Sequence, residues 1–91
     1  MKNSERYLRT KSIYLAAYVL AKGGELAGIG ILQDEVDFSF VRSPESESWA
    51  EDFNSGDEAL IDARVYASAF RLLSRERRKE LMKFHAREDQ P

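Results

Sequence analysis

The spacing of hydrophobic residues changes several times along the chain, and each spacing predicts a different secondary-structure element. Between residues 13 and 21, apolar residues recur at intervals of three and four, which is typical of one buried face of a helix. These residues are Ile13, Ala16, Ala17 and Leu20. Thr10 or Ser12 can cap this helix at its N-terminus. Gly23 and Gly24 predict its end, because glycine adopts the left-handed backbone conformation at no steric cost.

Alternation with a period of two follows over residues 27–32 and 36–41, and it predicts two strands that form a hairpin. Pairing Ile31 with Val36 places all the alternating apolar side chains on one face, which sets the register. The other pairs on that face are Ile29 with Phe38 and Ala27 with Phe40. The opposite face carries Gly28, Gly30, Asp37 and Ser39. We expect it to be either in contact with water or closely approached by another backbone.

Two further helices are predicted after the hairpin. Pro44 favours the first turn of a short helix, which the Asn54-Ser55-Gly56 segment ends. Asp57 can cap the last helix. The apolar residues of that helix form a stripe that stops at Ser74, and charged residues alone occupy 75–80. The stripe consists of Ala59, Ala63, Tyr66, Phe70 and Leu73. With its apolar neighbours it covers a wide face, which predicts that this helix is central to the core.

These elements define an α+β fold in the order α-β-β-α-α, in which helices cover one face of a short antiparallel β-hairpin. We expect residues 1–9 to be a flexible N-terminal segment and residues 10–74 to form a single α+β domain. Residues 75–91 are expected to be a charged helical extension with a polar tail. The side chains expected in the core are Phe38, Phe40, Trp49, Phe53, Tyr66, Phe70 and Leu73.

Composition narrows the class of protein. Hydrophobic residues make up 43% of the 91 residues and charged residues 33%, which is typical of one globular domain. The absence of cysteine excludes disulfides, thiolate nucleophiles and cysteine-bound zinc, and it is compatible with a reducing cytoplasm. The longest apolar run, residues 13–21, is much shorter than the roughly 20 residues of a membrane span, and no signal-peptide cleavage site follows it. We therefore expect a cytoplasmic protein that does not bind membranes.

Residues 10–29 read T-K-S-I-Y-L-A-A-Y-V-L-A-K-G-G-E-L-A-G-I, and this segment is similar to the opening of a family of short bacterial proteins of unknown function. In that family, a helix that begins T-x-S/D continues as L-A-A-x-L-L-A-x-G and leads into a strand that opens L-x-G. The resemblance extends through Phe38-Ser39-Phe40 and Phe53-Asn54-Ser55-Gly56 to Ala63-Arg64, over residues 7–73. It implies a compact bacterial cytosolic module, and the family brings no activity and no catalytic residues with it.

Side chains that support catalysis or metal binding do not occur in the required patterns. Gly28-Ile29-Gly30 could begin a dinucleotide-binding fingerprint, but Gln33 occupies the third glycine position and no helix follows. Three acidic side chains in residues 34–37 resemble a loose metal site, yet a hydrated hairpin turn explains them better because EF-hand spacing is lacking. His85, the one histidine, has no cysteine or second histidine with which to bind a metal. We therefore predict a protein that is not an enzyme, with no catalytic residue, cofactor or metal.

Basic residues supply the remaining signal of function. Residues 34–62 have a net charge of −9, whereas the segments before and after them carry +3 and +4. Arginines recur along one side of the last helix, away from its apolar stripe, and such a row can bind phosphates. This arginine row consists of Arg64, Arg71, Arg75 and Arg78. The alternative is a hydrated helix face whose positive charge is complementary to the acidic middle of the same chain or of a partner chain.

Self-association is the function that the pattern favours. An isolated hairpin is marginally stable in water, and its strands present unpaired backbone groups at their edges. Two hairpins paired edge to edge would form a homodimer, whose partner chain would cover Leu81, Met82 and Phe84 beyond the charged break. In the competing arrangement, the first helix or the N-terminal segment covers the edge within a monomer. The sequence thus predicts a self-associating interaction module, open to an unidentified protein partner. Its alternative is a nucleic-acid-associated accessory protein that uses the arginine row.

Overall fold

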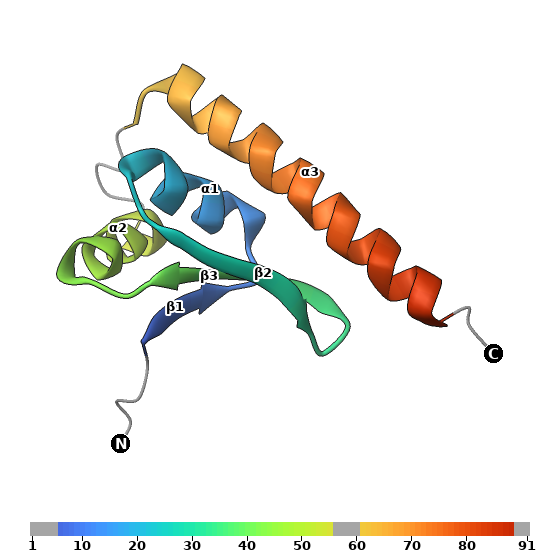
Figure 1. Ribbon diagram of the computed structural model, residues 1–91. Coiled ribbons are helices and arrows are strands. Elements are labelled where there is room, and N and C mark those ends of the chain that lie inside the picture. The colour runs from blue at the N-terminus through green and yellow to red at the C-terminus, as the bar shows by residue number, and fades with distance from the viewer. Residues whose placement is uncertain (1–5, 56–60, 89–91) are drawn as a thin grey trace.

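Within residues 6–55 and 61–88, which the computed structural model describes, the chain forms three strands and three helices. They are β1 (Tyr7–Thr10), α1 (Ile13–Lys22), β2 (Leu26–Leu32), β3 (Glu35–Val41), α2 (Pro44–Ser55) and α3 (Ala63–Glu88). The strands pair in the order β1-β3-β2, and both pairs are antiparallel. Helices α1 and α3 lie on one side of the sheet, and α2 packs against α1 (Figure 1). The structure therefore confirms the α+β class and the helical covering of one face.

Strand β1 corrects the predictions that residues 1–9 are a flexible segment and that the sheet has only two strands. It pairs with β3 so that Leu8 lies opposite Phe40, and the N–H of Arg42 donates to the carbonyl oxygen of Arg6 over 2.9 Å. The four residues of β1 alternate too briefly to predict a strand by themselves. They are extended because β3, distant in the sequence, offers them a free edge. The first five residues lie outside the described part of the chain.

The predicted register of the hairpin is confirmed in the half next to the turn. The confirmed pairs are Ile31 with Val36 and Ile29 with Phe38. The predicted pair between Ala27 and Phe40 is wrong, because a β-bulge shifts β2 so that Leu26 lies opposite Phe40 and Ala27 is exposed. The turn consists of Gln33 and Asp34, whose φ angles of 54° and 67° are those of the left-handed conformation. Two such residues in succession are typical of a type I′ hairpin turn.

Both ends of α1 follow from local chemistry. Ser12 is the N-cap, and its hydroxyl oxygen accepts a hydrogen bond from the N–H of Leu15 over 3.2 Å. Gly23, with a φ of 115°, ends the helix as predicted. Gly24 then donates to the carbonyl oxygen of Val19 over 2.8 Å, and a Cβ at Gly24 would lie 2.6 Å from Val19 Cγ1. Two glycines are therefore needed, the first for its backbone angle and the second for a close approach.

The predicted start is correct for α2 and wrong for α3. At the start of α2, the Ser43 hydroxyl oxygen accepts the N–H of Ser46 over 3.0 Å, and the Ser46 hydroxyl oxygen accepts the N–H of Ser43 over 2.9 Å. At α3, the carboxylate of Asp62 accepts the N–H of Arg64 over 2.8 Å, so Asp62 is the N-cap. The predicted cap, Asp57, lies outside the described residues. Helix α3 then continues through the charged stretch beyond its apolar stripe.

The centre of the core is α1, which corrects the prediction that the last helix is central. Residues 16–19 of α1 are at most 2% exposed, because this helix packs between the sheet, α2 and α3. Of the large side chains expected in the core, Phe38, Phe40 and Leu73 are fully buried. The other four are partly buried, and they are Trp49, Phe53, Tyr66 and Phe70. Helix α3 therefore covers the core from outside with a narrow face.

Candidate interaction surfaces

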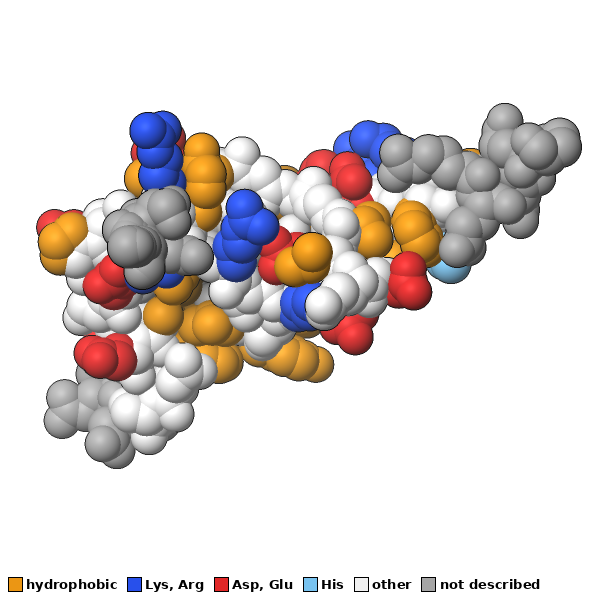
Figure 2. Space-filling view, turned by 90° about the horizontal axis from the view of Figure 1, so that it is seen from below, with side chains coloured by type: hydrophobic (Ala, Val, Ile, Leu, Met, Phe, Trp, Pro, Cys, Tyr) orange, Lys and Arg blue, Asp and Glu red, His pale blue; other side chains and the backbone are white. Residues whose placement is uncertain are grey.

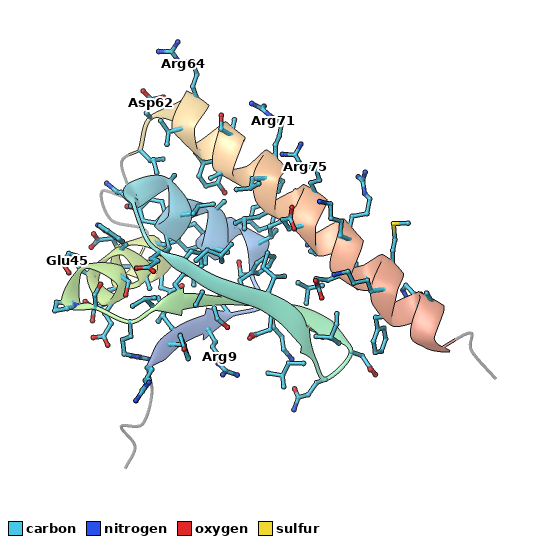
Figure 3. All side chains as sticks on the ribbon, viewed as in Figure 1. Arg9, Glu45, Asp62, Arg64, Arg71 and Arg75 are labelled. Atoms are coloured by element: carbon cyan, nitrogen blue, oxygen red, sulfur yellow. The ribbon has the colours of Figure 1, made fainter. Side chains whose placement is uncertain are left out.

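The arginine row is one outward surface of α3. Its four side chains, from Arg64 to Arg78, are exposed, and helical geometry places them on the side of α3 opposite the buried Leu73. Figure 3 shows Arg64, Arg71 and Arg75 directed away from the sheet. The structure thus brings the predicted residues together on one face of one rigid element.

Within residues 6–55 and 61–88, no ion pair joins the arginine row to an acidic side chain. Ion pairs do form elsewhere in this part of the chain. They include Lys11–Glu35, Arg42–Glu47, Lys79–Glu76 and Lys83–Glu80. Neutralisation of the row by the acidic middle of the same chain is therefore not seen among these residues. A phosphate ligand or an acidic partner surface would each meet four guanidinium groups that form no ion pair within the described residues.

Arg77 lies off the arginine row, although it lines one hollow together with Arg78. It follows Leu73 by four residues, which places it on the side of α3 that faces the rest of the fold. Its exposed side chain lines two adjoining hollows, one at the hairpin turn and one beside Tyr14 at the start of α1. The sequence interpretation left Arg77 out of every candidate site, although its spacing from Leu73 was the signal that could have distinguished it.

The apolar residues after the charged break do not share one side of α3. Leu81 packs against the core of its own chain, which corrects the expectation that a partner chain covers it. Met82 is 64% exposed, and Phe84 is half-buried with its ring 5.8 Å from the ring of His85. Successive residues of a helix point about 100° apart, so Met82 faces different surroundings from Leu81, whereas Leu81 and Phe84 lie on the same side. The three side chains do not form one apolar surface for a partner.

Strand β2 is an uncovered edge of the sheet. Strand β1 occupies the edge of β3 that the hairpin alone would leave free, so the N-terminal segment covers one of the two predicted edges. The seven residues of β2 include no charged side chain and no proline. In the part of the chain that the structure describes, β2 has backbone partners in β3 alone. Alternate N–H and C=O groups of β2 therefore point outward with no strand to receive them.

No described helix or strand packs on the face of the sheet away from α1 and α3. Figure 2 views the molecule from this side, where charged and hydrophobic side chains are interspersed with the white atoms of the backbone and other side chains. A Cβ added at Gly28 or Gly30 would meet no atom within 4 Å. Gly30 lies opposite Asp37, which is 8% exposed and has no hydrogen bond or ion pair among the described residues. No other backbone in this part of the chain approaches the two glycines, so the expected close approach of another backbone to this face is not seen among the described residues.

The remaining candidates for chemistry are dispersed. Asp34 lies in the hairpin turn, and the Glu35 carboxylate lies 3.9 Å from Nζ of Lys11. Among the described residues, no group of three or more histidine or acidic side chains is placed to hold a metal ion. Gly28-Ile29-Gly30 lies inside β2, and the turn after it leads to a strand rather than to a helix. None of the helices in the described ranges combines the length and the hydropathy of a membrane span.

Comparison with known proteins adds no relative to this description. The chain matches no family model, no curated protein and no solved structure among those compared. The fold and its surfaces nevertheless define a class: a small α+β domain with an uncharged open sheet edge and, on another side, a basic helix face.

Proposed function

We propose that this chain is a non-enzymatic interaction module of the bacterial cytoplasm, and that it forms a homodimer through the edge of β2. The resemblance to the family of short bacterial proteins supports the bacterial and cytosolic assignment. The edge of β2 is the observation that supports self-association. Proteins commonly protect such an edge with charges, proline or a covering element. Residues 26–32 contain neither charge nor proline, and only the bulge at Ala27 twists one end. A regular segment of residues 28–32 is left for pairing.

Antiparallel pairing of two β2 strands around a two-fold axis would join two sheets into one continuous sheet. Each copy would contribute the same residues, as an isologous contact requires. The outward backbone groups would then form hydrogen bonds between chains. Ile29 and Ile31, which are partly exposed on the helix side of the sheet, would bring the two apolar cores together. The thin core of a 91-residue chain gains most from such an extension.

Gly30→Lys tests this proposal with little risk to the fold, because a Cβ at Gly30 meets no atom of its own chain. Light scattering at micromolar concentration should give the native chain a mass of twice 10.4 kDa and the variant a mass of 10.4 kDa. Two added lysines near the two-fold axis would repel each other across the new strand pair. A mass of 10.4 kDa for the native chain at this concentration contradicts the proposal.

Ser39→Lys is the matched control for the mode of pairing. Ser39 lies opposite Gly28 on the uncovered face, but it belongs to the central strand β3. Pairing by edges leaves this position away from the contact, so the variant should remain a dimer. Packing by sheet faces would instead bury the new lysine, and loss of the dimer in this control would reject the edge of β2 as the contact.

Nucleic-acid binding by the arginine row is the second candidate function. Its support is the exposure of four arginines with no acidic partner among the described residues. Each phosphate neutralised on duplex DNA lowers the logarithm of the binding constant by about 0.9 per tenfold rise in salt. A row of four side chains therefore predicts steep loss of binding as salt rises.

Retention on a heparin or DNA column tests this second function. Replacing Arg71, Arg75 and Arg78 by glutamine should abolish retention without unfolding the chain. Replacing Lys79 and Lys83, which already pair with glutamates on α3, should reduce retention much less. Passage of the native chain through the column at low salt excludes the function.

A further inference from the structure

A hollow of about 330 Å³ lies between the start of α1 and the middle of α3. Ile13 and Tyr14 line it from α1, and Ser74, Arg77 and Arg78 line it from α3 together with two apolar side chains. Its volume is within the range of small-molecule sites in proteins. The two walls come from segments that are about 60 residues apart in the sequence, so only the packing of α3 against α1 creates the hollow.

The aromatic ring of Tyr14 lies at the edge of this hollow, and contacts with α3 hold it in position. The residue Tyr14 is 60% exposed, so part of its ring is free to contact a ligand. Its ring packs against the ring of Phe70, with 5.5 Å between the centroids. The hydroxyl of Tyr66 donates to the carbonyl oxygen of Tyr14 over 3.5 Å. Because α3 contacts both the ring and the backbone of Tyr14, this ring is a positioned platform for stacking.

The charge of the hollow is positive. Arg77 and Arg78 contribute exposed guanidinium groups, and among the described residues no acidic side chain lines the hollow. Neither arginine has an ion pair within the described residues. The adjoining hollow, which shares Arg77, does contain Asp34 and Glu35, and the Glu35 carboxylate lies 3.9 Å from Lys11 Nζ. Helix α1 also begins here without an acidic residue in its first turn, so its positive end adds to the potential.

We propose that this hollow binds a phosphate monoester attached to a planar ring, a ligand of mononucleotide size. Two guanidinium groups that line the same hollow match the phosphate, since arginine donates paired hydrogen bonds to its oxygens. The exposed face of Tyr14 receives the ring by stacking. The Ser74 hydroxyl can donate a further hydrogen bond from the same wall. This site does not depend on self-association. It shares Arg78 with the arginine row, but it also uses Arg77, which lies off that row.

Calorimetric titration with AMP at low salt tests the proposal, with inorganic phosphate and adenosine as comparison probes. AMP should bind more tightly than either fragment. The double variant Arg77→Gln and Arg78→Gln should weaken AMP binding by about tenfold or more, as loss of charge-assisted hydrogen bonds requires. Tyr14→Leu keeps an apolar contact for Phe70 and should bring AMP binding close to that of phosphate.

The matched control is the double variant Arg64→Gln and Arg71→Gln, which removes the same charge from the outer side of α3. It should leave AMP binding within about twofold of native, since neither side chain lines the hollow. An equal loss in this control would mean that general charge, rather than the hollow, attracts AMP, and it would overturn the proposal. Absence of AMP binding to the native chain at millimolar concentration, or phosphate binding as tight as that of AMP, would also overturn it. Each variant is first shown to keep the native thermal unfolding transition.

Discussion

The hydroxyl of Tyr66 in α3 donates a hydrogen bond to the backbone carbonyl oxygen of Tyr14 in α1, over 3.5 Å. The two residues also share an aromatic neighbour, because Phe70 lies 6.2 Å from the Tyr66 ring and 5.5 Å from the Tyr14 ring. Burial raises the pKa of the Tyr66 phenol above its ordinary value of 10.0, and the nearby Tyr14 phenol raises this pKa further. The contact between the two helices is therefore sensitive to alkaline pH.

The raised pKa of Tyr66 predicts that the free energy of unfolding falls as pH rises above about 10. Below the ordinary pKa the phenol is neutral in both states, so the stabilisation is complete. Above it, the unfolded chain ionises first, and proton release favours unfolding until the folded phenol also ionises. Tyr66→Phe should remove this part of the pH dependence and cost only about 0.5 kcal/mol near neutral pH, because the lost hydrogen bond is long. Urea unfolding at a series of pH values measures both effects, and an unchanged alkaline slope in the variant would contradict the assignment.

Phe38 and Phe70 should differ in their contribution to stability. Phe38 is fully buried in the middle strand, so Phe38→Ala should lower the free energy of unfolding by about 3–5 kcal/mol. Phe70 is only partly buried, and Phe70→Ala leaves a site that water can enter, so its cost should be smaller. Chemical denaturation of the two variants gives the comparison. Equal costs would show that α3 is as central to the core as the middle strand β3.

Tyr18→Phe should stabilise the protein. The Tyr18 side chain is buried between α1 and α2, where its ring lies 5.6 Å from that of Phe53, and its hydroxyl has no hydrogen-bond partner among the described residues. Removing this unsatisfied hydroxyl should raise the free energy of unfolding by about 1 kcal/mol. That corresponds to a rise of about 4–8 °C in Tm for a domain of this size. Tyr14→Phe, at an exposed position, is the control and should leave Tm almost unchanged; a fall in Tm for Tyr18→Phe would reveal a partner for the hydroxyl.

The hairpin turn should accept Asn-Gly in place of Gln33 and Asp34. Both residues have positive φ angles, which asparagine and glycine adopt more readily in a type I′ turn. The double substitution should raise the free energy of unfolding by about 1 kcal/mol. The hydrogen bond from Lys11 Nζ to Gln33 Oε1 is lost, but it is exposed and contributes little. Thermal unfolding measures the gain, and Asp34→Gly alone should provide part of it; a lower Tm would argue against the left-handed turn.

Local patterns predicted those elements whose ends and spacing are determined by neighbours in the chain. The end of α1 follows from Gly23 and Gly24, and the start of α2 follows from Ser43 and Pro44, because caps are contacts between residues a few positions apart. The register near the turn follows from period-two alternation. The arginine row was likewise predictable, because exposed residues on one helix keep the spacing of the helix.

What the sequence by itself determined is therefore the class of fold, most of its elements and one charged face, since propensity, capping and periodicity act over a few residues. Only the tertiary structure decided that Tyr7–Thr10 is a strand and that β2 is left as the open edge. It also decided that Tyr14 stands beside Arg77. These relations join segments far apart in the sequence, and their energy comes from packing and backbone pairing that no local pattern records. The open edge and the hollow, from which both proposals of binding start, exist only once those distant segments have come together.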